Sequence, residues 1–183
     1  KLIVKGANFT WGKYAIAEVE VLSEKDVMKN TYASVMGSTL SENNLLRTAS
    51  FTSVTSGSVP PEQAFDYNIS STYESATSNT SFPEEFIFTW SDAVSASAFR
   101  LFANYASQQA PNAIEIYTCH AGDDWKLKEV ASISWITSET GNQYVNIPID
   151  ATDITGIKIV ITGANMTWSK YNISEMELLP SAD

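Results

Sequence analysis

Cysteine is almost absent from this sequence, and its absence limits how the chain can be stabilised. Cys119 is the only cysteine among 183 residues, so no disulfide can form within the chain. A small fold framed by disulfides is therefore excluded. A chain of this length can bury enough apolar surface to fold without such links, and 44% hydrophobic residues supply a core. A single cysteine is more often a small buried side chain than a nucleophile.

Positive charge is also scarce. Only 11 Lys and Arg residues stand against 21 Asp and Glu, which gives a net charge of −10. Because no basic stripe is present to neutralise phosphates, nucleic acid and anionic membrane surfaces are excluded as partners. No apolar run approaches the length that spans a bilayer, so we expect no membrane insertion. The acidic, Ser-, Thr- and Asn-rich composition is typical of secreted or cell-surface proteins, and we expect an extracellular or cell-surface location.

Residues that would support catalysis are lacking as well. His120 is the only histidine, so a two-histidine metal site cannot form and a hydrolytic triad would have to use this turn residue. The carboxylates occur mostly as Glu-Glu or Asp-Asp pairs or at strand edges, without the apolar surroundings that raise a catalytic pKa. No glycine-rich phosphate-binding loop occurs. We therefore predict that the chain is not an enzyme.

The strongest positive feature is a repeat at the two ends of the chain. Residues 4–22 read VKGANFTWGKYAIAEVEVL and residues 161–179 read ITGANMTWSKYNISEMELL, with 11 of 19 positions identical. Two interpretations are open: residues 1–22 are the closing segment of a preceding sister domain, which we favour, or they are an internal duplication within one fold. The polar, weakly patterned residues 23–41 are then a linker with at most one short helix, and the main domain covers residues 42–180.

Short β-strands are predicted through most of the main domain. Phe86, Phe88 and Trp90 share one face of their segment, and Ile114 and Ile116 alternate with polar neighbours. This period of two indicates strands with one buried face, and no helical stripe of useful length is present. The sequence therefore predicts an all-β, antiparallel β-sandwich. The predicted strands are 48–55, 84–90, 96–103, 112–119, 125–131, 142–149, 156–162 and 171–179.

Four stretches carry a resemblance to a known family. Residues 64–75 (AFDYNISSTYES) are similar to an A-x-D-G-[DN]-x-x-T-x-W-x-S segment, and residues 96–102 (ASAFRLF) to the strand that follows it. Residues 112–125 (NAIEIYTCHAGDDW) are similar to a strand leading into S-x-D-G-x-x-W, and residues 171–179 (YNISEMELL) to a closing I-x-E-I-E-L strand. Together they resemble the discoidin domain, also called the coagulation factor V/VIII type C domain, a group that includes bacterial family 32 carbohydrate-binding modules. The resemblance implies a jelly-roll β-sandwich of the galactose-binding-like fold.

The resemblance also implies a structural calcium ion. In the family, the first of these loops and a glutamate of the closing strand wrap the ion, and the matching residues here are Asp66, Asn68, Ser71 and Glu175. Hard oxygen ligands on a tight loop suit calcium. Three positions depart from the pattern, with Tyr67 at the usual Gly, Ser71 at the usual Thr and Tyr73 at the usual Trp. The alternative interpretation is that Asp66 caps a turn and Glu175 is solvated.

A carbohydrate site needs an aromatic face for the apolar side of a pyranose and hydrogen-bonding groups for its hydroxyls. In the resembling family, loops at one end of the sandwich build this site. Three loops here have a suitable composition. Their candidate residues are Tyr73, Asn104, Tyr105, Gln108, Asn112, Trp168 and Tyr171, and Arg100 is a further candidate outside these loops. Three alternatives stay open: Tyr73 packs structurally, Arg100 pairs with an acid, or Trp168, which recurs as Trp11, is a shared requirement of the fold.

These features predict a non-catalytic carbohydrate-binding module within a larger secreted or cell-surface protein. Its partners would be a glycan, of galactose type or from another host or plant polysaccharide, and the other domains of the same polypeptide. A single site of this kind would bind weakly, and tandem copies would add avidity. The alternative is an adhesive or structural domain that contacts a protein or acts as a spacer. Exposed aromatics over a small polar groove favour a glycan, whereas a broad flat apolar patch favours a protein partner.

Overall fold

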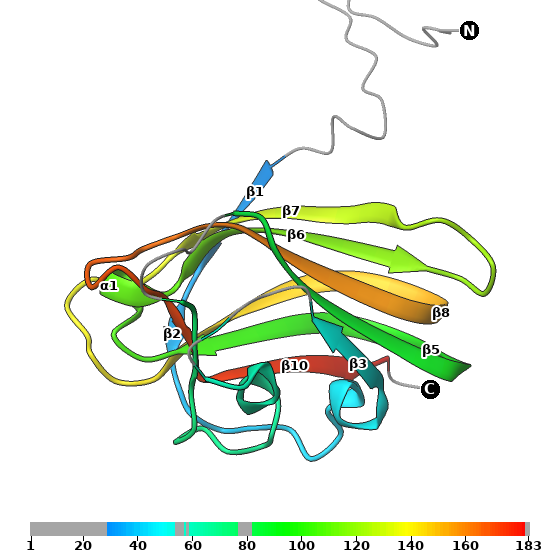
Figure 1. The fold of residues 1–183 in the computed structure, drawn as a ribbon, viewed down its shortest axis with the longest axis horizontal. Helices are drawn as coiled ribbons and strands as arrows, with labels where there is room; N and C mark the ends of the chain where they lie inside the picture. Colours follow the sequence, from blue (N-terminus) through cyan, green and yellow to red (C-terminus); the bar gives the residue numbers. More distant parts are fainter. Residues whose placement is uncertain (1–28, 54–56, 58, 77–81, 182–183) are drawn as a thin grey trace, which may run out of the picture.

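The computed structural model describes residues 29–53, 57, 59–76 and 82–181 (Figure 1). The first copy of the repeat lies outside these residues, so its assignment to a sister domain stays a prediction. The strands are β1 (Lys29–Ala33), β2 (Val35–Met36), β3 (Ser50–Ser53), β4 (Tyr73–Glu74), β5 (Glu84–Ala103), β6 (Pro111–Cys119), β7 (Lys126–Ser134), β8 (Gln143–Ala164), β9 (Asn172–Ile173) and β10 (Glu175–Pro180). The short helical turns are η2 (Leu45–Thr48), η3 (Pro61–Ala64) and α1 (Ala106–Gln109).

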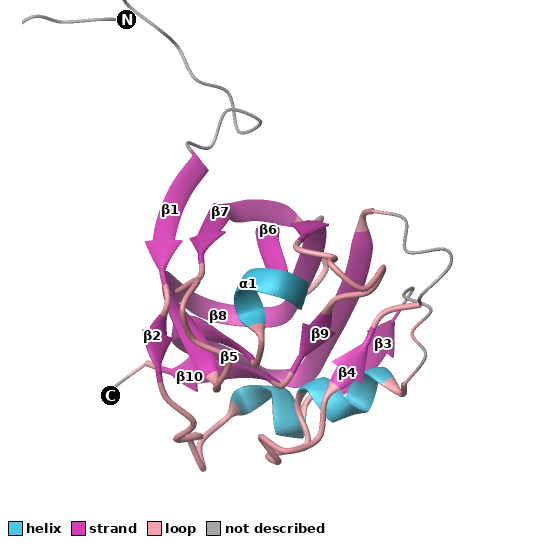
Figure 2. Ribbon diagram, turned by 90° about the vertical axis from the view of Figure 1, so that its left-hand side faces the viewer, coloured by secondary structure: helices cyan, strands magenta, loops and turns pink. Residues whose placement is uncertain are grey.

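Two long antiparallel strands, β5 and β8, run through both layers of the fold. In one layer the first half of β5 pairs with the second half of β8, and β3, β6 and β7 extend the sheet on either side. In the other layer the second half of β5 pairs with the first half of β8, and β10 and β2 flank them. Register irregularities near Val94 and Ala96 bend the pair between the layers. The predicted β-sandwich is thus confirmed, and Figure 2 shows it end-on as strands wrapped around a common interior.

The N-terminal edge of the sandwich differs from the prediction. Residues 29–36, which the sequence assigns to a linker with at most a short helix, form β1 and β2 instead. β1 pairs with β7 in parallel, whereas the other strand pairs of the described chain are antiparallel. The physical reason is the open edge of β7, which offers unpaired backbone groups to an otherwise polar segment. Within β1, only Tyr32 is partly buried against the core, so no periodic pattern marks the strand.

The core follows the period-two alternation read from the sequence. Phe86, Phe88, Ile114 and Ile116 are fully buried between the layers. Each such side chain contributes roughly 1.5–3 kcal/mol relative to leaving it in water. Their neighbours in β5 and β6 lie on the outer face of the sheet, where polar side chains are tolerated. None of the helices in the described ranges is both long enough and apolar enough to cross a membrane.

Candidate functional site

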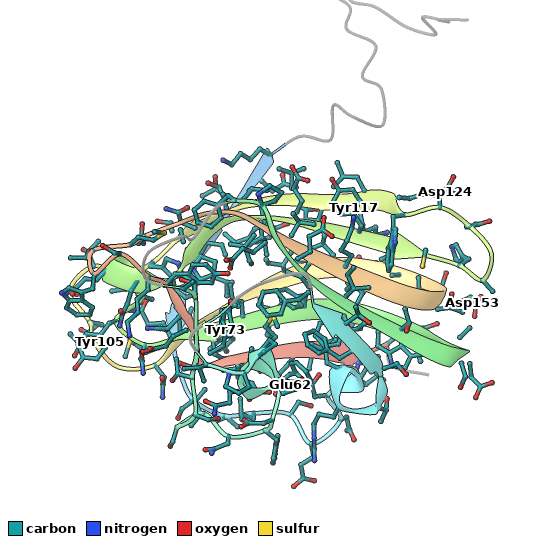
Figure 3. All side chains as sticks on the ribbon, viewed as in Figure 1. Glu62, Tyr73, Tyr105, Tyr117, Asp124 and Asp153 are labelled. Carbon is teal, nitrogen blue, oxygen red and sulfur yellow. The ribbon has the colours of Figure 1, made fainter. Side chains whose placement is uncertain are left out.

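An exposed pair of aromatic rings lies at one end of the sandwich. Tyr105 follows β5, Trp168 lies in the loop after β8, and their rings meet edge to face with centroids 6.2 Å apart. Tyr105 is 42% exposed and Trp168 is 51% exposed. Figure 3 shows Tyr105 at this loop end, next to α1. Rings left in water add little to folding, so an exposed pair is a surface on which an apolar face of a ligand can stack.

Backbone hydrogen bonds fix the position of Tyr105. This residue has a left-handed backbone with φ 46°, a conformation that costs free energy for a side chain with a Cβ. Its N–H donates to the Thr140 carbonyl at 3.1 Å, and its own carbonyl accepts from the N–H groups of Gln108 and Gln109 at 2.8 and 3.1 Å. These bonds hold the strained turn, so the ring is oriented before a ligand arrives.

The loop that carries Trp168 is held in a similar way. Ser169 also has a left-handed backbone, with φ 61°, and its N–H donates to the Met166 carbonyl at 3.0 Å. The Thr167 N–H donates to the Gln108 carbonyl at 2.9 Å, which links this loop to α1. Trp168 therefore stands on a tight turn that is attached to the segment carrying Tyr105.

Amide side chains border the two rings. The Asn112 Nδ2 donates to Asn165 Oδ1 at 2.9 Å, and the Asn165 Nδ2 donates to the Ala106 carbonyl at 3.0 Å, so both amides help to hold the loop. Gln109 is buried and its Oε1 has no hydrogen-bond partner in the described structure, which leaves an acceptor to be satisfied. The structure brings together five of the predicted residues at this end: Asn104, Tyr105, Gln108, Asn112 and Trp168.

Tyr73 and Tyr171 are fully buried, so the prediction that they contact sugar is wrong. Pairing of β4 with β9 draws both rings into the interior. The Tyr171 hydroxyl donates to Glu84 Oε2, and the Tyr73 hydroxyl lies 3.5 Å from the same atom. Burial raises the pKa of Glu84 against the opposing effect of these hydroxyls, and burial also raises the pKa of Tyr171 far above its usual value. These hydroxyls thus serve an interior carboxyl group rather than a ligand.

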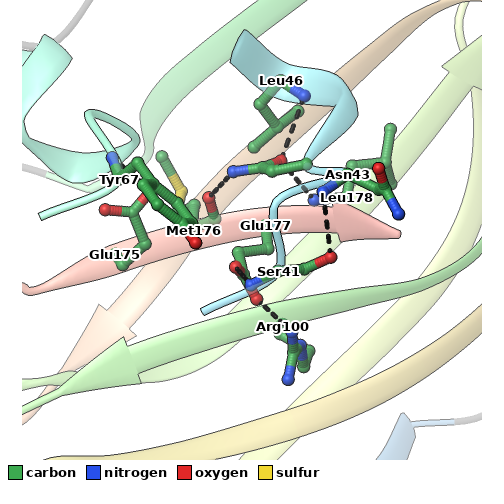
Figure 4. A network of polar contacts seen from close by, with 10 residues as sticks. Ser41, Asn43, Leu46, Tyr67, Arg100, Glu175, Met176, Glu177 and Leu178 are labelled. Carbon is green, nitrogen blue, oxygen red and sulfur yellow. Dashed lines mark hydrogen bonds and ion pairs between the residues drawn. The ribbon is translucent and has the colours of Figure 1, made fainter. Parts of the chain in front are cut away.

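Arg100 pairs with an acid, and its contact with sugar stays a prediction. It points to the outer face of β5, where it forms an ion pair with Glu177 of β10 (Figure 4). Its guanidinium lies 5.4 Å from the Phe102 ring centroid and 5.5 Å from that of Tyr144. Glu177 is fully buried and also accepts a hydrogen bond from the Ser41 N–H. Arg100 therefore neutralises a buried carboxylate, as the alternative interpretation held.

The four predicted calcium ligands lie together. Asp66 Oδ1 accepts hydrogen bonds from the Asn68 N–H at 2.9 Å and the Ser71 hydroxyl at 2.8 Å. Glu175 Oε1 accepts from the Tyr67 N–H at 3.4 Å. Tyr67 has φ 63° at the position where the family pattern has glycine, so the left-handed turn is kept although its usual residue is not.

Glu175 has the features of a cation ligand. It is fully buried, and its Oε2 has no hydrogen-bond partner in the described structure. Burial raises the pKa of Glu175 to about 8, and the charge of Asp66 adds to the increase. Among the described residues, no three His, Cys, Asp or Glu side chains are grouped for a metal. Calcium here would therefore take Glu175 and Asp66 together with neutral oxygens of the loop, and that donor set fits this ion.

Sequence reasoning missed one contributor to the loop end. The Thr140 carbonyl, from the loop between β7 and β8, fixes Tyr105. Backbone carbonyls carry no residue-type signal, so this contact could not be chosen from the sequence.

No family profile matches this sequence, and no curated protein matches it. Solved structures do match. The chain is similar to the family 32 module of Clostridium perfringens NanJ in complex with galactose, at TM-score 0.53 and 18% identity over 73% of this chain and 94% of that one. It is similar to the CBM32-1 and CBM32-2 domains of C. perfringens ZmpB in complex with GalNAc, at TM-score 0.56 and 17% identity over 74% of this chain. A CBM32-3 domain from a C. perfringens family 31 glycoside hydrolase matches at TM-score 0.56 and 11% identity, over 74% of this chain and 96% of that one.

These matches establish the fold. The chain has the discoidin-like β-sandwich of family 32 carbohydrate-binding modules, so the resemblance inferred from four short stretches is confirmed at the level of fold. The chain spans about a third of the two-module ZmpB structure, at 34%.

Proposed function

We propose that this domain is a non-catalytic carbohydrate-binding module that binds glycan through Tyr105 and Trp168. The observation that carries the proposal is the exposed ring pair, held on two strained turns that are hydrogen-bonded to the same short helix. The apolar face of a pyranose stacks on such rings. Asn104 and Gln108, on the same segment as Tyr105, supply polar groups for its hydroxyls.

The end repeat supports a ligand role for Trp168. This residue recurs as Trp11 in the first copy. A residue that recurs because the fold requires it should be buried, as Tyr171 and Glu175 are. Because Trp168 is 51% exposed, burial in the core does not explain its recurrence, and contact with a ligand is compatible with it.

The similar solved structures guide the choice of sugar and context. Two of them hold galactose or GalNAc, so we propose a galactose-type glycan as the first ligand to test. Several come from multidomain proteins, which favours a module within a larger secreted or cell-surface bacterial protein. A single site would bind at micromolar to millimolar concentration, as is usual for small shallow sites.

A glycan array followed by titration calorimetry tests the proposal. We expect galactose-type glycans to bind the wild type, and Trp168→Ala to weaken binding about tenfold or more, which is about 1.4 kcal/mol. Glu62→Gln is the control, because it changes an exposed side chain on η3, outside both the loop end and the calcium loop. Binding of no glycan by the wild type on a broad array would refute the proposal.

We also propose that Asp66, Asn68, Ser71 and Glu175 hold a structural calcium ion. The ion would satisfy the unpaired Glu175 Oε2 and offset the charges of two neighbouring carboxylates. Calcium is expected to raise the melting temperature of the wild type relative to chelator, and to leave Glu175→Gln unchanged. An equal melting temperature of the wild type in calcium and in chelator would remove the ion from this proposal.

One observation favours the alternative, an adhesive domain that contacts a protein. Val35 and Met36 are 49% and 47% exposed. Met36 lies beside Gly141, the neighbour of the Thr140 that fixes Tyr105. These exposed aliphatic side chains therefore lie near the loop that fixes Tyr105. If Met36→Ser abolished adhesion to a ligand-coated surface while a broad array showed no glycan binding, the protein-contact function would replace the glycan function.

A further inference from the structure

The outer face of the sheet contains a groove that the loop-end site does not use. It has a volume of about 350 Å³, and its lining includes Phe82, Glu85, Glu115, Tyr117, Lys158 and Val160; we call it the strand groove. Its volume is within the range of small-molecule sites, roughly 300–1,000 Å³. Figure 3 shows Tyr117 on the upper sheet, away from Tyr105 at the loop end.

Strand register fixes the order of charges in the strand groove. Val160 of β8 is paired with Glu85 of β5 on one side and with Glu115 of β6 on the other, so two carboxylates flank an apolar floor. Two residues earlier on β8, Lys158 is paired across to Tyr117 of β6. Because side chains alternate between faces, these residues all lie opposite the buried Ile159 and Ile161.

Contacts within the groove hold these groups in place. The Lys158 ammonium lies 3.6 Å from Glu85 Oε1 and 4.7 Å from the Tyr117 ring centroid. The Tyr117 hydroxyl donates to Glu115 Oε2 at 2.5 Å. That hydrogen bond, with burial, raises the pKa of Tyr117 to about 12, so the hydroxyl stays a donor at neutral pH. The groove is therefore preorganised, which lowers the entropy lost when a ligand binds.

The charge pattern selects the ligand class. Glu85 and Glu115 repel an anion. The Lys158 ammonium lies beside Glu85, so both signs of charge are available to a ligand. A neutral molecule with many hydroxyls matches the pattern, because each hydroxyl both donates to carboxylates and accepts from ammonium or hydroxyl groups. Phe82, which is 37% exposed, adds an aromatic wall at one end.

We propose that the strand groove is a second saccharide-binding site. This second site rests on the proposed function, because it assumes that the domain binds glycan. The two sites are joined structurally: Phe82 stacks on Tyr171 with centroids 6.1 Å apart, and Tyr171 ends the loop that carries Trp168. The outward residues of β8 lead along the strand from Lys158 to that same loop. One chain would thus carry two saccharide sites.

Amide NMR titration of the full chain with D-galactose, and separately with N-acetylgalactosamine, tests the second site. We expect saturable shifts at Glu115, Tyr117 and Val160 as well as at the loop end. In Trp168→Ala the groove shifts should persist. In the double variant Glu115→Gln with Lys158→Met the loop-end shifts should persist while groove affinity falls about tenfold or more.

The control is Glu62→Gln, which changes an exposed carboxylate on η3 and should alter neither set of shifts. Tyr117→Phe tests the groove with a smaller change, and amide spectra verify that each variant is folded. Shifts at the loop end alone would overturn the second site and leave the proposed function intact. Shifts in the groove alone would support the second site and refute the loop-end function. Shifts at neither place would overturn both.

Discussion

Two aromatic pairs in this domain have almost the same geometry and opposite surroundings. The rings of Tyr73 and Tyr171 lie 6.0 Å apart at 60°, and those of Tyr105 and Trp168 lie 6.2 Å apart at 64°. The first pair is fully buried around a carboxyl group, whereas the second stands in solvent on strained turns. Ring geometry therefore does not distinguish a structural pair from a ligand platform. The two kinds of pair are distinguished instead by the hydrogen-bond partners of the hydroxyl groups and by the backbone conformation at each ring.

Tyr171→Ala should have the largest effect. Removing a buried ring leaves a cavity and should lower the free energy of unfolding by about 3–5 kcal/mol. The corresponding change in the exposed pair, Trp168→Ala, should stay within about 0.5 kcal/mol. Urea unfolding of both variants measures this difference, and equal destabilisation would mean that the two pairs share a structural role.

The buried carboxyl groups should make the interior sensitive to pH. Burial raises the pKa of Glu175 to about 8 and also raises the pKa of Glu84 and Glu177. A raised folded-state pKa means that the folded chain holds the proton more tightly, so stability is greatest in acid and is lost as pH rises. For Glu175 alone the loss is about 3 kcal/mol between pH 5 and pH 8 in chelator.

Urea unfolding at several pH values measures this loss. Glu175→Gln should flatten the profile, and calcium should offset the loss in the wild type because it binds the ionised form. If the free energy of unfolding rose with pH in chelator, it would contradict the assignment of Glu175 as a buried carboxyl group whose negative charge lacks enough hydrogen-bond partners.

Tyr171→Phe tests the hydroxyl group of the buried pair separately from its ring. The ring stays, but the hydroxyl donor to Glu84 is lost. An interior carboxyl group left with one donor fewer should cost about 1–2 kcal/mol. Thermal unfolding measures this cost, and glycan binding should be unaffected. A weaker glycan affinity in Tyr171→Phe would show that the buried pair also shapes the loop end.

The smallest expected effect is a difference in stability between two variants that both lack the Tyr105 ring. Tyr105→Ala and Tyr105→Asn should weaken glycan binding equally, because both delete the stacking surface. At φ 46° alanine should be less stable than asparagine by about 1 kcal/mol, because asparagine tolerates the left-handed backbone. Calorimetry and thermal unfolding measure the two quantities side by side. Unequal binding would mean that the turn, rather than the ring, determines affinity.

Local patterns in the sequence were sufficient to predict the sandwich and its core. Alternation located Phe86, Phe88, Ile114 and Ile116 correctly, because a residue's face in a strand depends on its immediate neighbours. Alternation could not show that the predicted strands 84–90 and 96–103 are one strand, β5. The bend between them depends on its pairing with β8, far along the chain. The edge strand β1 was missed for the same reason.

The candidate site was predicted only in part. Tyr105 and Trp168 were identified because they lie in predicted loops whose composition suits a sugar site. Tyr73 and Tyr171 were placed beside them because nothing near either residue reveals the β4–β9 pairing that buries both. Arg100 meets its partner Glu177 only through the β5–β10 register. Burial of a polar side chain depends on residues distant in sequence, so single-sequence reasoning cannot assign it.

The passage of β5 and β8 through both layers has a mechanical consequence. The described chain enters at the β1 edge of one layer and leaves from β10 at the edge of the other (Figure 1). A pulling force applied to the two ends therefore crosses the ladder between β8 and β5, which pairs residues 84–103 with residues 143–161. In a protein that tethers its neighbours to a surface, this ladder would carry the load from one layer to the other.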